Sequence, residues 1–425
     1  MVPRSLTEDV HRRMAAAQRA LAERPVDEIL AALDRVCRRW LDRSDPIRQE
    51  AEDRIATGTG LAPAMLADGL SQMIRRMQGL PALLDADLGS RYALDRFIAR
   101  PGGIRSMAFG PGLLVCVFSG NVPGIPAFDM ALGLALKSAC LVRPAAEEPD
   151  FAPLFARSVA EVDPDLGACL HVARWAHDDA APYQRAGAVL AYGSDGSIAA
   201  IRRLVPGGVR FIGHGHRLSF ACVAAEAATA ETASRLALDV AMYDQQGCVS
   251  PHMAFIERGG PLSPAAFARA VADALAGLQE RMPRGRLTLE EAVALRSARD
   301  EAEFTADACY LSPGDLAWAV VHHEEPDFRP SPLGRFLWTY AVDRLADVAP
   351  LVAPHSAYLQ TVAFAGADAG RLALAEALGR VGVSRVAPVG LVQEPHPLWR
   401  HDGRPTAGDL VRWVDVEPEA GGGSW

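Results

Sequence analysis

The sequence predicts an α/β protein of two domains with a helical layer at its N-terminal end. The chain has 425 residues, which is too long for one ordinary hydrophobic core. Apolar residues recur every three or four positions through residues 1–100, a spacing typical of helices. From residue 110, short apolar strands alternate with helical stretches, and this alternation predicts parallel sheets with right-handed crossovers.

The composition narrows the class of protein. Apolar residues make up 50% of the chain and charged residues 22%, as in soluble globular proteins, and the net charge of −9 argues against nucleic-acid binding. Seven scattered cysteines without a C-x-x-C pair argue against a disulfide framework and a zinc site. The uncharged run from Phe109 to Phe128 contains three prolines and four glycines, so no membrane span is expected. We therefore expect a cytoplasmic protein without a structural metal.

The first domain is expected over residues 1–240. Three helical segments open it, and a sheet follows whose strands are short apolar runs ended by glycine, serine or proline. The expected strands are "GLLVCVFSG" (112–120), "CLVRP" (140–144), "AVLAYGS" (188–194), "VRFIG" (209–213) and "SFACVA" (219–224).

The second domain is expected over residues 241–390, with strands such as "HMAFIE", "LAWAVVHH" and "RFLWTYAV". A long helix over 230–247 precedes it and is expected to end at Gly247, a favourable C-cap residue. Residues 391–425 are expected to return to the first domain or to an oligomer interface, with a disordered tail.

The loop "FSGNVPGIPAF" (118–128) is the first candidate for a ligand site. It follows a buried strand and opens a helix, and α/β folds bind ligands at such carboxyl ends of parallel strands. Asn121 either points its amide into this crevice or satisfies its own backbone in a turn. A complete G-x-G-x-x-G motif in a strand–turn–helix setting and a P-loop motif are both absent from the sequence, so the standard dinucleotide fingerprint gives no support.

Cys248, in "YDQQGCVSP" (243–251), is either a buried core thiol or a nucleophile. The other six cysteines fall within strand or helix patterns, where a small apolar role suits them. Cys248 instead follows Gly247 at a helix-to-strand junction, where small neighbours allow close approach. A thiolate there can attack a carbonyl carbon while an amide such as that of Asn121 holds the oxyanion.

Two histidine-containing stretches are weaker candidates. His322 and His323 end an expected strand, where adjacent side chains point to opposite faces, so we interpret them as a solvated edge rather than a metal site. The stretch "WRHDG" (399–403) suggests a His–Asp pair, but a loop role is the preferred interpretation.

Four segments in this order resemble the acyl-CoA reductase family, to which the fatty-acid reductase subunit of bacterial bioluminescence belongs, within the aldehyde dehydrogenase superfamily. They are "GLLVCVFSGNVPGIPAFDMALGLALKSACLVRP", "VLAYGSDGSIAAIRRL", "YDQQGCVSP" and "WRHDGRPTAGDLVRWVDVE". The resemblance covers about residues 95–417. It implies an aldehyde dehydrogenase-like fold, with a Rossmann-like NADP-binding domain, an α/β domain carrying the catalytic cysteine, and assembly into dimers or tetramers.

The resemblance also implies a role for each motif residue. Cys248 matches the catalytic nucleophile, and Asn121 matches the amide that forms the oxyanion hole with the cysteine N–H. Arg143 and Pro144 stand beside the adenosine ribose, where an arginine suits a 2′-phosphate, so NADPH is the expected cofactor. The remaining residues of the expected cofactor site are Ser119, Gly193, Ser194 and Gly196.

One difference from the superfamily pattern indicates which reaction to expect. Residues 213–223, "GHGHRLSFACV", stand where hydrolytic members carry a glutamate that activates water, and they contain none. We therefore expect NADPH-dependent reduction of an acyl-CoA or an acyl-carrier protein to an aldehyde through a cysteine acyl-enzyme, with His214 or His216 as an aid to proton transfer. The alternatives are a cysteine acyltransferase without redox chemistry and a non-catalytic scaffold.

Overall fold

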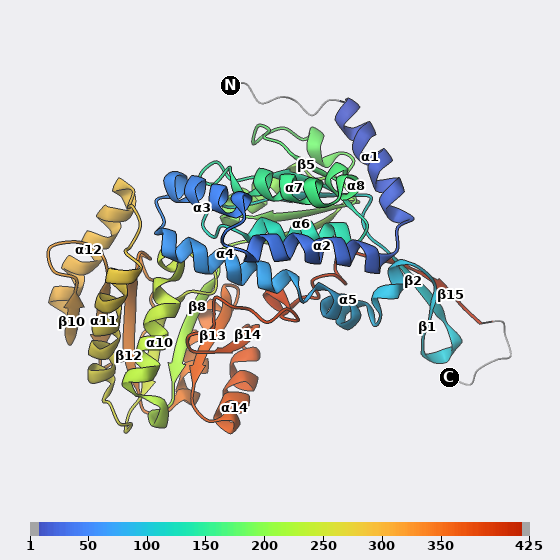
Figure 1. The fold of residues 1–425 in the computed structure, drawn as a ribbon. Coiled ribbons are helices and arrows are strands. Elements are labelled where there is room, and N and C mark those ends of the chain that lie inside the picture. Colours follow the sequence, from blue (N-terminus) through green and yellow to red (C-terminus); the bar gives the residue numbers. More distant parts are fainter. Residues whose placement is uncertain (1–7, 419–425) are drawn as a thin grey trace. The chain divides into compact units, whose positions relative to one another are not determined.

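The structure, a computed structural model, describes residues 8–418 (Figure 1). The chain forms two compact units. Within the described residues, the first comprises 8–58, 70–215 and 396–418, and the second comprises 59–69 and 216–395. Most of the tail for which the sequence predicts disorder lies outside the described residues.

Helices dominate the N-terminal hundred residues, as the spacing predicts. In α2 the apolar residues lie on one buried face, and Trp40 at its end is fully buried and donates a hydrogen bond of 2.8 Å from its indole nitrogen to Ser158. The helices are α1 (Glu8–Ala22), α2 (Val26–Leu41), α3 (Pro46–Thr59), α4 (Pro63–Met77) and α5 (Leu80–Leu88).

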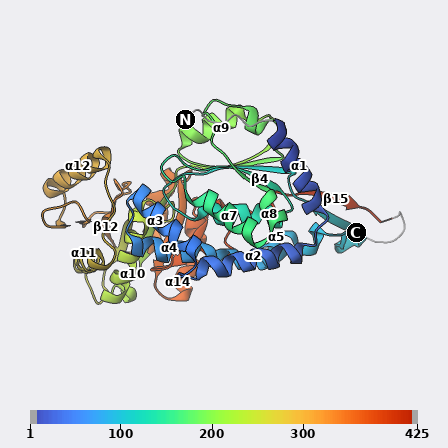
Figure 2. The same ribbon diagram turned by 45° about the horizontal axis from the view of Figure 1, so that its top comes forward.

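A five-stranded parallel sheet forms the core of the first unit, in the order β5-β4-β3-β6-β7. Helices cover both faces, and Figure 2 shows β4 between α9 on one side and α7 on the other. The strands are β3 (Leu113–Val117), β4 (Ala139–Arg143), β5 (Leu170–Val172), β6 (Ala188–Tyr192) and β7 (Arg210–His214). The helices are α6 (Ile125–Ala135), α7 (Phe151–Val162), α8 (Pro164–Ala168) and α9 (Asp195–Leu204).

A three-stranded antiparallel sheet ties the C-terminal segment to the first unit. It contains β1 (Ile98–Ala99), β2 (Arg105–Phe109) and β15 (Arg412–Val416), and β15 pairs with β2 over five residues. This sheet was not predicted from the sequence, because four of the five residues of β15 are exposed and the strand lacks a buried apolar run.

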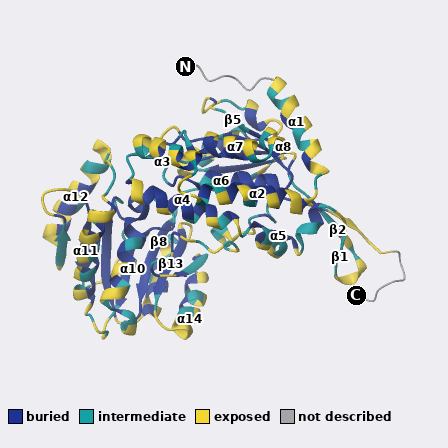
Figure 3. Cartoon of the chain, viewed as in Figure 1, coloured by how far each residue is buried: buried dark blue, intermediate teal, exposed yellow. Residues whose placement is uncertain are grey.

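A seven-stranded sheet forms the second unit, in the order β10-β11-β12-β9-β8-β13-β14, and only β10 and β11 pair antiparallel. Alternate residues face two separate cores, so its central strands are buried throughout (Figure 3). The strands are β8 (Leu218–Val223), β9 (Pro251–Glu257), β10 (Ala308–Leu311), β11 (Ala319–His323), β12 (Phe336–Val342), β13 (Leu359–Ala365) and β14 (Arg385–Pro388). The helices are α10 (Ala230–Ala241), α11 (Pro264–Arg281), α12 (Leu289–Thr305), α13 (Val348–Val352) and α14 (Asp368–Gly379).

Two predicted boundaries differ from the structure. The units divide after residue 215 rather than at 240, because β8 pairs with β9 and β13 of the second sheet. The helix expected over 230–247 ends at Ala241, since Tyr243, Asp244 and Gln245 all adopt positive φ angles that no α-helix contains.

Candidate active site

Cys248 differs from the other cysteines in its surroundings. Burial raises the pKa of the other six thiols, to about 12 for Cys37 and Cys169, so these groups stay protonated and unreactive at neutral pH. Cys248 is only partly buried and lies in a turn between α10 and β9. Position and chemistry therefore make Cys248 the candidate nucleophile of the chain.

Three consecutive left-handed residues shape the chain before Cys248. Tyr243, Asp244 and Gln245 have φ angles of 51°, 50° and 68°, a conformation that costs energy for residues other than glycine. Gln245 is fully buried and compensates by bonding in three directions. Its amide nitrogen donates to the carbonyls of Pro251 (2.7 Å) and Phe336 (2.8 Å), and its oxygen accepts from the Phe336 N–H (2.9 Å). This glutamine fastens the turn to β9 and β12.

A buried ion pair holds the same turn from the other side. The Arg335 guanidinium donates to Asp244 at 2.8 Å, and the Gly285 N–H donates to the other carboxylate oxygen at 2.9 Å. Burial raises the pKa of Asp244 and lowers that of Arg335 although the two attract each other. Desolvation thus outweighs the attraction in each group, which indicates a pair that fixes geometry more than it adds stability.

The backbone of Cys248 itself is anchored. The Ser219 hydroxyl donates to the Cys248 carbonyl at 2.8 Å, and the Ser250 N–H closes a turn onto the Gly247 carbonyl at 2.9 Å. The Gln393 amide in turn donates to the Ser250 hydroxyl at 2.7 Å. The backbone on both sides of the Cys248 thiol is therefore held by hydrogen bonds, as a preorganised nucleophile requires.

Asn121 lies in the first unit, directly after β3. The Ser119 hydroxyl donates to the amide oxygen of Asn121 at 2.7 Å, so the nitrogen is left as the donor end of this side chain. A donor is the group that an oxyanion needs. Gly120 between them packs against the 145–148 loop so closely that a Cβ would lie 3.1 Å from Glu147. The close approach favours glycine and keeps the loop in place.

Arg143 and Pro144 end the neighbouring strand β4 at the same edge of the sheet. Pro144 is buried, whereas Arg143 is partly exposed. One guanidinium nitrogen of Arg143 lies 3.3 Å from both ring nitrogens of His177, so the guanidinium lies over the imidazole, and it is 5.9 Å from the Trp175 ring. Arg143 is thus held at the sheet edge by ring contacts and can still reach a phosphate.

Gly193, Ser194 and Gly196 form the turn from β6 into α9. The Ser194 hydroxyl caps the helix by accepting from the Ser197 N–H at 3.2 Å. A Cβ at Gly196 would meet nothing closer than 3.9 Å, so the turn is open. An exposed helix N-terminus of this kind attracts negatively charged phosphates.

A buried carboxylate contacts the strand that leads into this turn. Asp129 of α6 bonds to the Tyr192 hydroxyl, and burial raises the pKa of Asp129 to about 6 although Arg76, Tyr192 and His214 favour its ionised form. Its second oxygen has no hydrogen-bond partner among the described residues and faces a cavity of about 30 Å³. A cavity of that size holds one water molecule.

The histidine interpretations need correction. His322 is fully buried rather than solvated, and its ring nitrogens bond to Thr339 (3.1 Å) and Glu324 (3.2 Å). His252, next to the cysteine turn, is also buried; burial lowers its pKa to about 4, and it accepts from the Ser331 N–H at 3.1 Å. His252 could not be predicted from the sequence, because its partner is a backbone group 79 positions later.

The structure thus groups the predicted site residues by unit. Asn121, Ser119, Arg143, Pro144, Gly193, Ser194 and Gly196 all lie in the first unit, at the carboxyl ends of β3, β4 and β6, while Cys248 lies in the second. The meeting of Cys248 with Asn121 stays a prediction. The roles of Gln245, Ser219 and Arg335 were not predicted from the sequence. For Gln245 the one local signal is that it lies three positions before Cys248.

Comparison with solved structures defines the fold class. The chain is similar to a putative aldehyde dehydrogenase from Burkholderia cenocepacia, with a TM-score of 0.74 and 16% identity over 96% of this chain and 92% of that one. A similar match is the NAD-dependent aldehyde dehydrogenase from Burkholderia multivorans, with a TM-score of 0.71 and 17% identity over 98% and 85% of the two chains. The protein therefore has the aldehyde dehydrogenase fold.

Sequence comparison narrows the class to a family. The profile of the acyl-CoA reductase (LuxC) family matches residues 21–413, and the chain belongs to this family of oxidoreductases. Two curated relatives are long-chain acyl-protein thioester reductases. That of Vibrio harveyi is 23% identical over 92% of this chain and 83% of the relative, and that of Aliivibrio fischeri is 25% identical over 92% and 82%.

Proposed function

We propose that the protein reduces an acyl thioester to an aldehyde, with NADPH as the reductant and Cys248 as the point of covalent attachment. The observation that carries the proposal is the anchored turn around Cys248, the cysteine whose thiol is neither in a core nor within a regular element. The family and the printed activity of its curated relatives support the same reaction.

The residues of the chain suit each step. The Cys248 thiolate attacks the thioester carbonyl, and the oxyanion takes hydrogen bonds from the Asn121 amide and the Cys248 N–H. The thiol of the donor leaves with a proton, and the acyl group remains on Cys248. After reduction, the thiohemiacetal on Cys248 collapses, which releases the aldehyde and restores the thiolate. Residues 213–223 offer no carboxylate to activate water, so hydrolysis of the acyl-enzyme is disfavoured.

The first unit fits a dinucleotide phosphate. The open turn at Gly196 and the N-terminus of α9 suit a pyrophosphate, and Arg143 at the end of β4 suits a 2′-phosphate. Bound NADPH supplies the hydride that reduces the acyl group. Ser119 supports this site by orienting Asn121.

The donor is an acyl-CoA or an acyl-carrier protein. The family description names acyl-CoA, while the curated relatives are described by acyl-protein thioesters. A long acyl chain follows from the description of those relatives. Within the described residues, no helix is long and apolar enough to cross a membrane.

Stoichiometry tests the proposal. The purified protein is incubated with NADPH and a panel of acyl-CoA and acyl-carrier-protein thioesters, and cofactor, free thiol and aldehyde are measured together. One aldehyde and one thiol for each NADPH consumed is the expected result. Thiol exchange between donors without loss of NADPH would instead show a cysteine acyltransferase, and the absence of both reactions would show a scaffold.

A further inference from the structure

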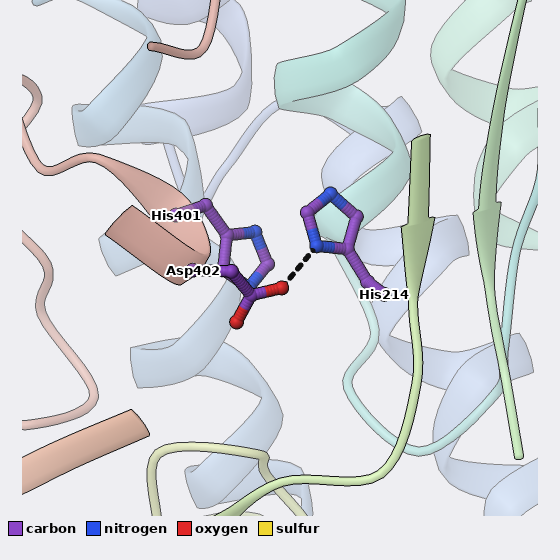
Figure 4. Close-up of side chains that lie close together, drawn as sticks. All are labelled: His214, His401 and Asp402. Carbon is purple, nitrogen blue, oxygen red and sulfur yellow. Dashed lines mark hydrogen bonds and ion pairs between the residues drawn. The ribbon is translucent and has the colours of Figure 1, made fainter. Parts of the chain in front are cut away.

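The C-terminal segment contacts the carboxyl edge of the first unit's parallel sheet. Residues His401–Gly403 form a single helical turn in which Asp402 adopts a left-handed conformation with φ of 53°. Asp402 accepts a hydrogen bond of 2.7 Å from Nδ1 of His214, the last residue of β7 (Figure 4). The interpretation of "WRHDG" as a loop stands, with one helical turn in it, and the structure adds that its aspartate pairs with a histidine 188 positions earlier.

Aromatic stacking reinforces this bond. The His401 ring lies 4.1 Å from the His214 ring at an angle of 8°, and the Tyr192 ring lies 4.7 Å from His214 on a 22° incline. His214 and Asp402 have side chains only 10% and 11% exposed. Two residues of the C-terminal segment thus hold His214. Asp402 bonds to the edge of its ring, and His401 stacks on the face of its ring.

A metal ion is a poor occupant of this cluster. The ligand atoms of His214, His401 and Asp402 lie within 4.8 Å of one another, which is close enough for ligation. The lone pairs of imidazole lie in the ring plane, however, and two nearly parallel stacked rings cannot both direct them at one ion. Asp402 already accepts the Nδ1–H of His214. The geometry instead favours two contacts that we call the clamp: the hydrogen bond from His214 to Asp402 and the stacking of the His401 ring on the His214 ring.

The clamp connects directly to the open turn after β6. The Gly193 N–H donates to the backbone carbonyl of His214 at 3.2 Å, and Tyr192 pairs with His214 in the sheet register. Tyr192 also places its ring between those of His214 and Phe118, the latter at 5.7 Å and 20°. A displacement of His214 would therefore move the first residue of the turn that leads to Ser194.

We propose that Asp402 and His401 are positioning residues that fix the Gly193–Ser194 turn through His214 and thereby set the affinity for the dinucleotide cofactor. This inference rests on the proposed function, which places the cofactor at that turn. An exposed loop that is already held in one conformation loses less freedom when a ligand binds, so the clamp strengthens binding without contacting the ligand.

The proposal predicts a graded series of variants in the full-length protein. Asp402→Ala removes the acceptor and is expected to raise the NADPH dissociation constant about fivefold or more, as loss of one buried hydrogen bond to a charged group can. Asp402→Asn keeps an oxygen that can accept from Nδ1, so it should restore most of the affinity. His401→Ala removes only the stack and should raise the constant about twofold.

Asp415→Asn is the matched control. Asp415 lies on the same C-terminal segment and accepts from Ser106 at 2.5 Å, but it belongs to the three-stranded sheet rather than to the clamp. It changes the same charge and should leave the constant unaltered. Titration of the intrinsic fluorescence with NADPH measures all four variants, and thermal unfolding without cofactor shows that each is folded.

The outcomes separate the two levels of the proposal. If the unaltered protein binds no NADPH, the proposed function fails. If it binds and Asp402→Ala binds equally well, the clamp proposal fails while the proposed function stands. Equal losses in Asp402→Ala and Asp402→Asn would also overturn it, because the hydrogen bond would then not be the cause. Tighter binding of Zn²⁺ by the unaltered protein than by His401→Ala would overturn the clamp in favour of a metal site.

Discussion

The turn around Cys248 and the turn around Ser194 are built in opposite ways. The first has three left-handed residues, a fully buried glutamine and a buried ion pair, all of which cost energy unless every hydrogen bond is made. The second is exposed, capped by one serine and open at Gly196. The difference suits the two proposed roles, since a nucleophile benefits from one fixed geometry, whereas an open turn leaves room for a cofactor to enter and leave.

Replacing the thiol should have the largest effect on activity. Cys248→Ala is expected to abolish reduction, by at least about three orders of magnitude, because no other group can carry the acyl intermediate. Cys309→Ala is the matched control, since Cys309 is the other partly buried cysteine and should be dispensable. NADPH consumption with an acyl thioester measures both. Full activity of the Cys248 variant would remove the covalent mechanism from consideration.

Loss of the Gln245 hydrogen bonds that hold the cysteine turn should have the largest effect on the free energy of unfolding. Gln245→Leu removes the glutamine partner of the Phe336 N–H and of the Pro251 carbonyl in a buried site, while the Phe336 carbonyl keeps its bond from the Ser331 hydroxyl, so we expect about 3 kcal/mol of destabilisation. Gln246→Leu, which loses a partly buried bond to Glu291, should cost less than about 1 kcal/mol. Urea unfolding compares them; equal costs would mean that the buried glutamine does not hold the turn.

The buried carboxylate of Asp129 should produce a pH dependence of stability of at most similar size. The pKa of Asp129 in the folded protein is about 6, above its ordinary value, because burial disfavours its charge. Between about pH 4 and 6 the unfolded chain loses this proton while the folded chain keeps it, so stability falls as the pH rises through this window.

Asp129→Asn removes that loss. Relative to the unaltered protein, the variant should gain up to about 3 kcal/mol as the pH rises from 4 to 7, and the gain should level off above pH 7. Thermal unfolding across pH checks the trend. A difference that stays constant from pH 4 to 8 would contradict the raised pKa.

The smallest expected effect concerns the choice of cofactor. Arg143→Ala should lower kcat/KM for NADPH about tenfold and leave that for NADH nearly unchanged, because only NADPH carries the 2′-phosphate. Arg143→Lys should fall between them, since lysine keeps the charge without the fork. Equal losses of kcat/KM with both cofactors would show that the 2′-phosphate does not bind at the end of β4.

The sequence predicted the parts that depend on local pattern. The buried strands β3, β4 and β6 are continuous apolar runs, and the loops after them follow from glycine, serine and proline. The motif residues of the first unit were therefore placed at the correct edge of the correct sheet. Cys248 was singled out as the candidate nucleophile because it alone fell outside the predicted strands and helices.

The sequence could not predict the parts that depend on distant partners. The left-handed conformation of Gln245 is maintained by its hydrogen bond to Phe336, 91 residues later. The residues near Cys248 contain no pattern that predicts this bond. The end of the helix was misplaced for the same reason, because tertiary hydrogen bonds overrule the C-cap preference of Gly247. The pairing of Asp402 with His214 likewise joins segments whose local patterns are both weak.

The return of the C-terminal segment to the first unit bears on the order in which the chain matures during synthesis. The residues of the seven-stranded sheet run from Leu218 to Pro388, so this sheet can be complete while the last residues are still unmade. The first unit lacks Asp402 and β15 until residues beyond Pro388 have been made. In the nascent protein, the turn around Cys248 can therefore form before Asp402 and His401 can contact His214.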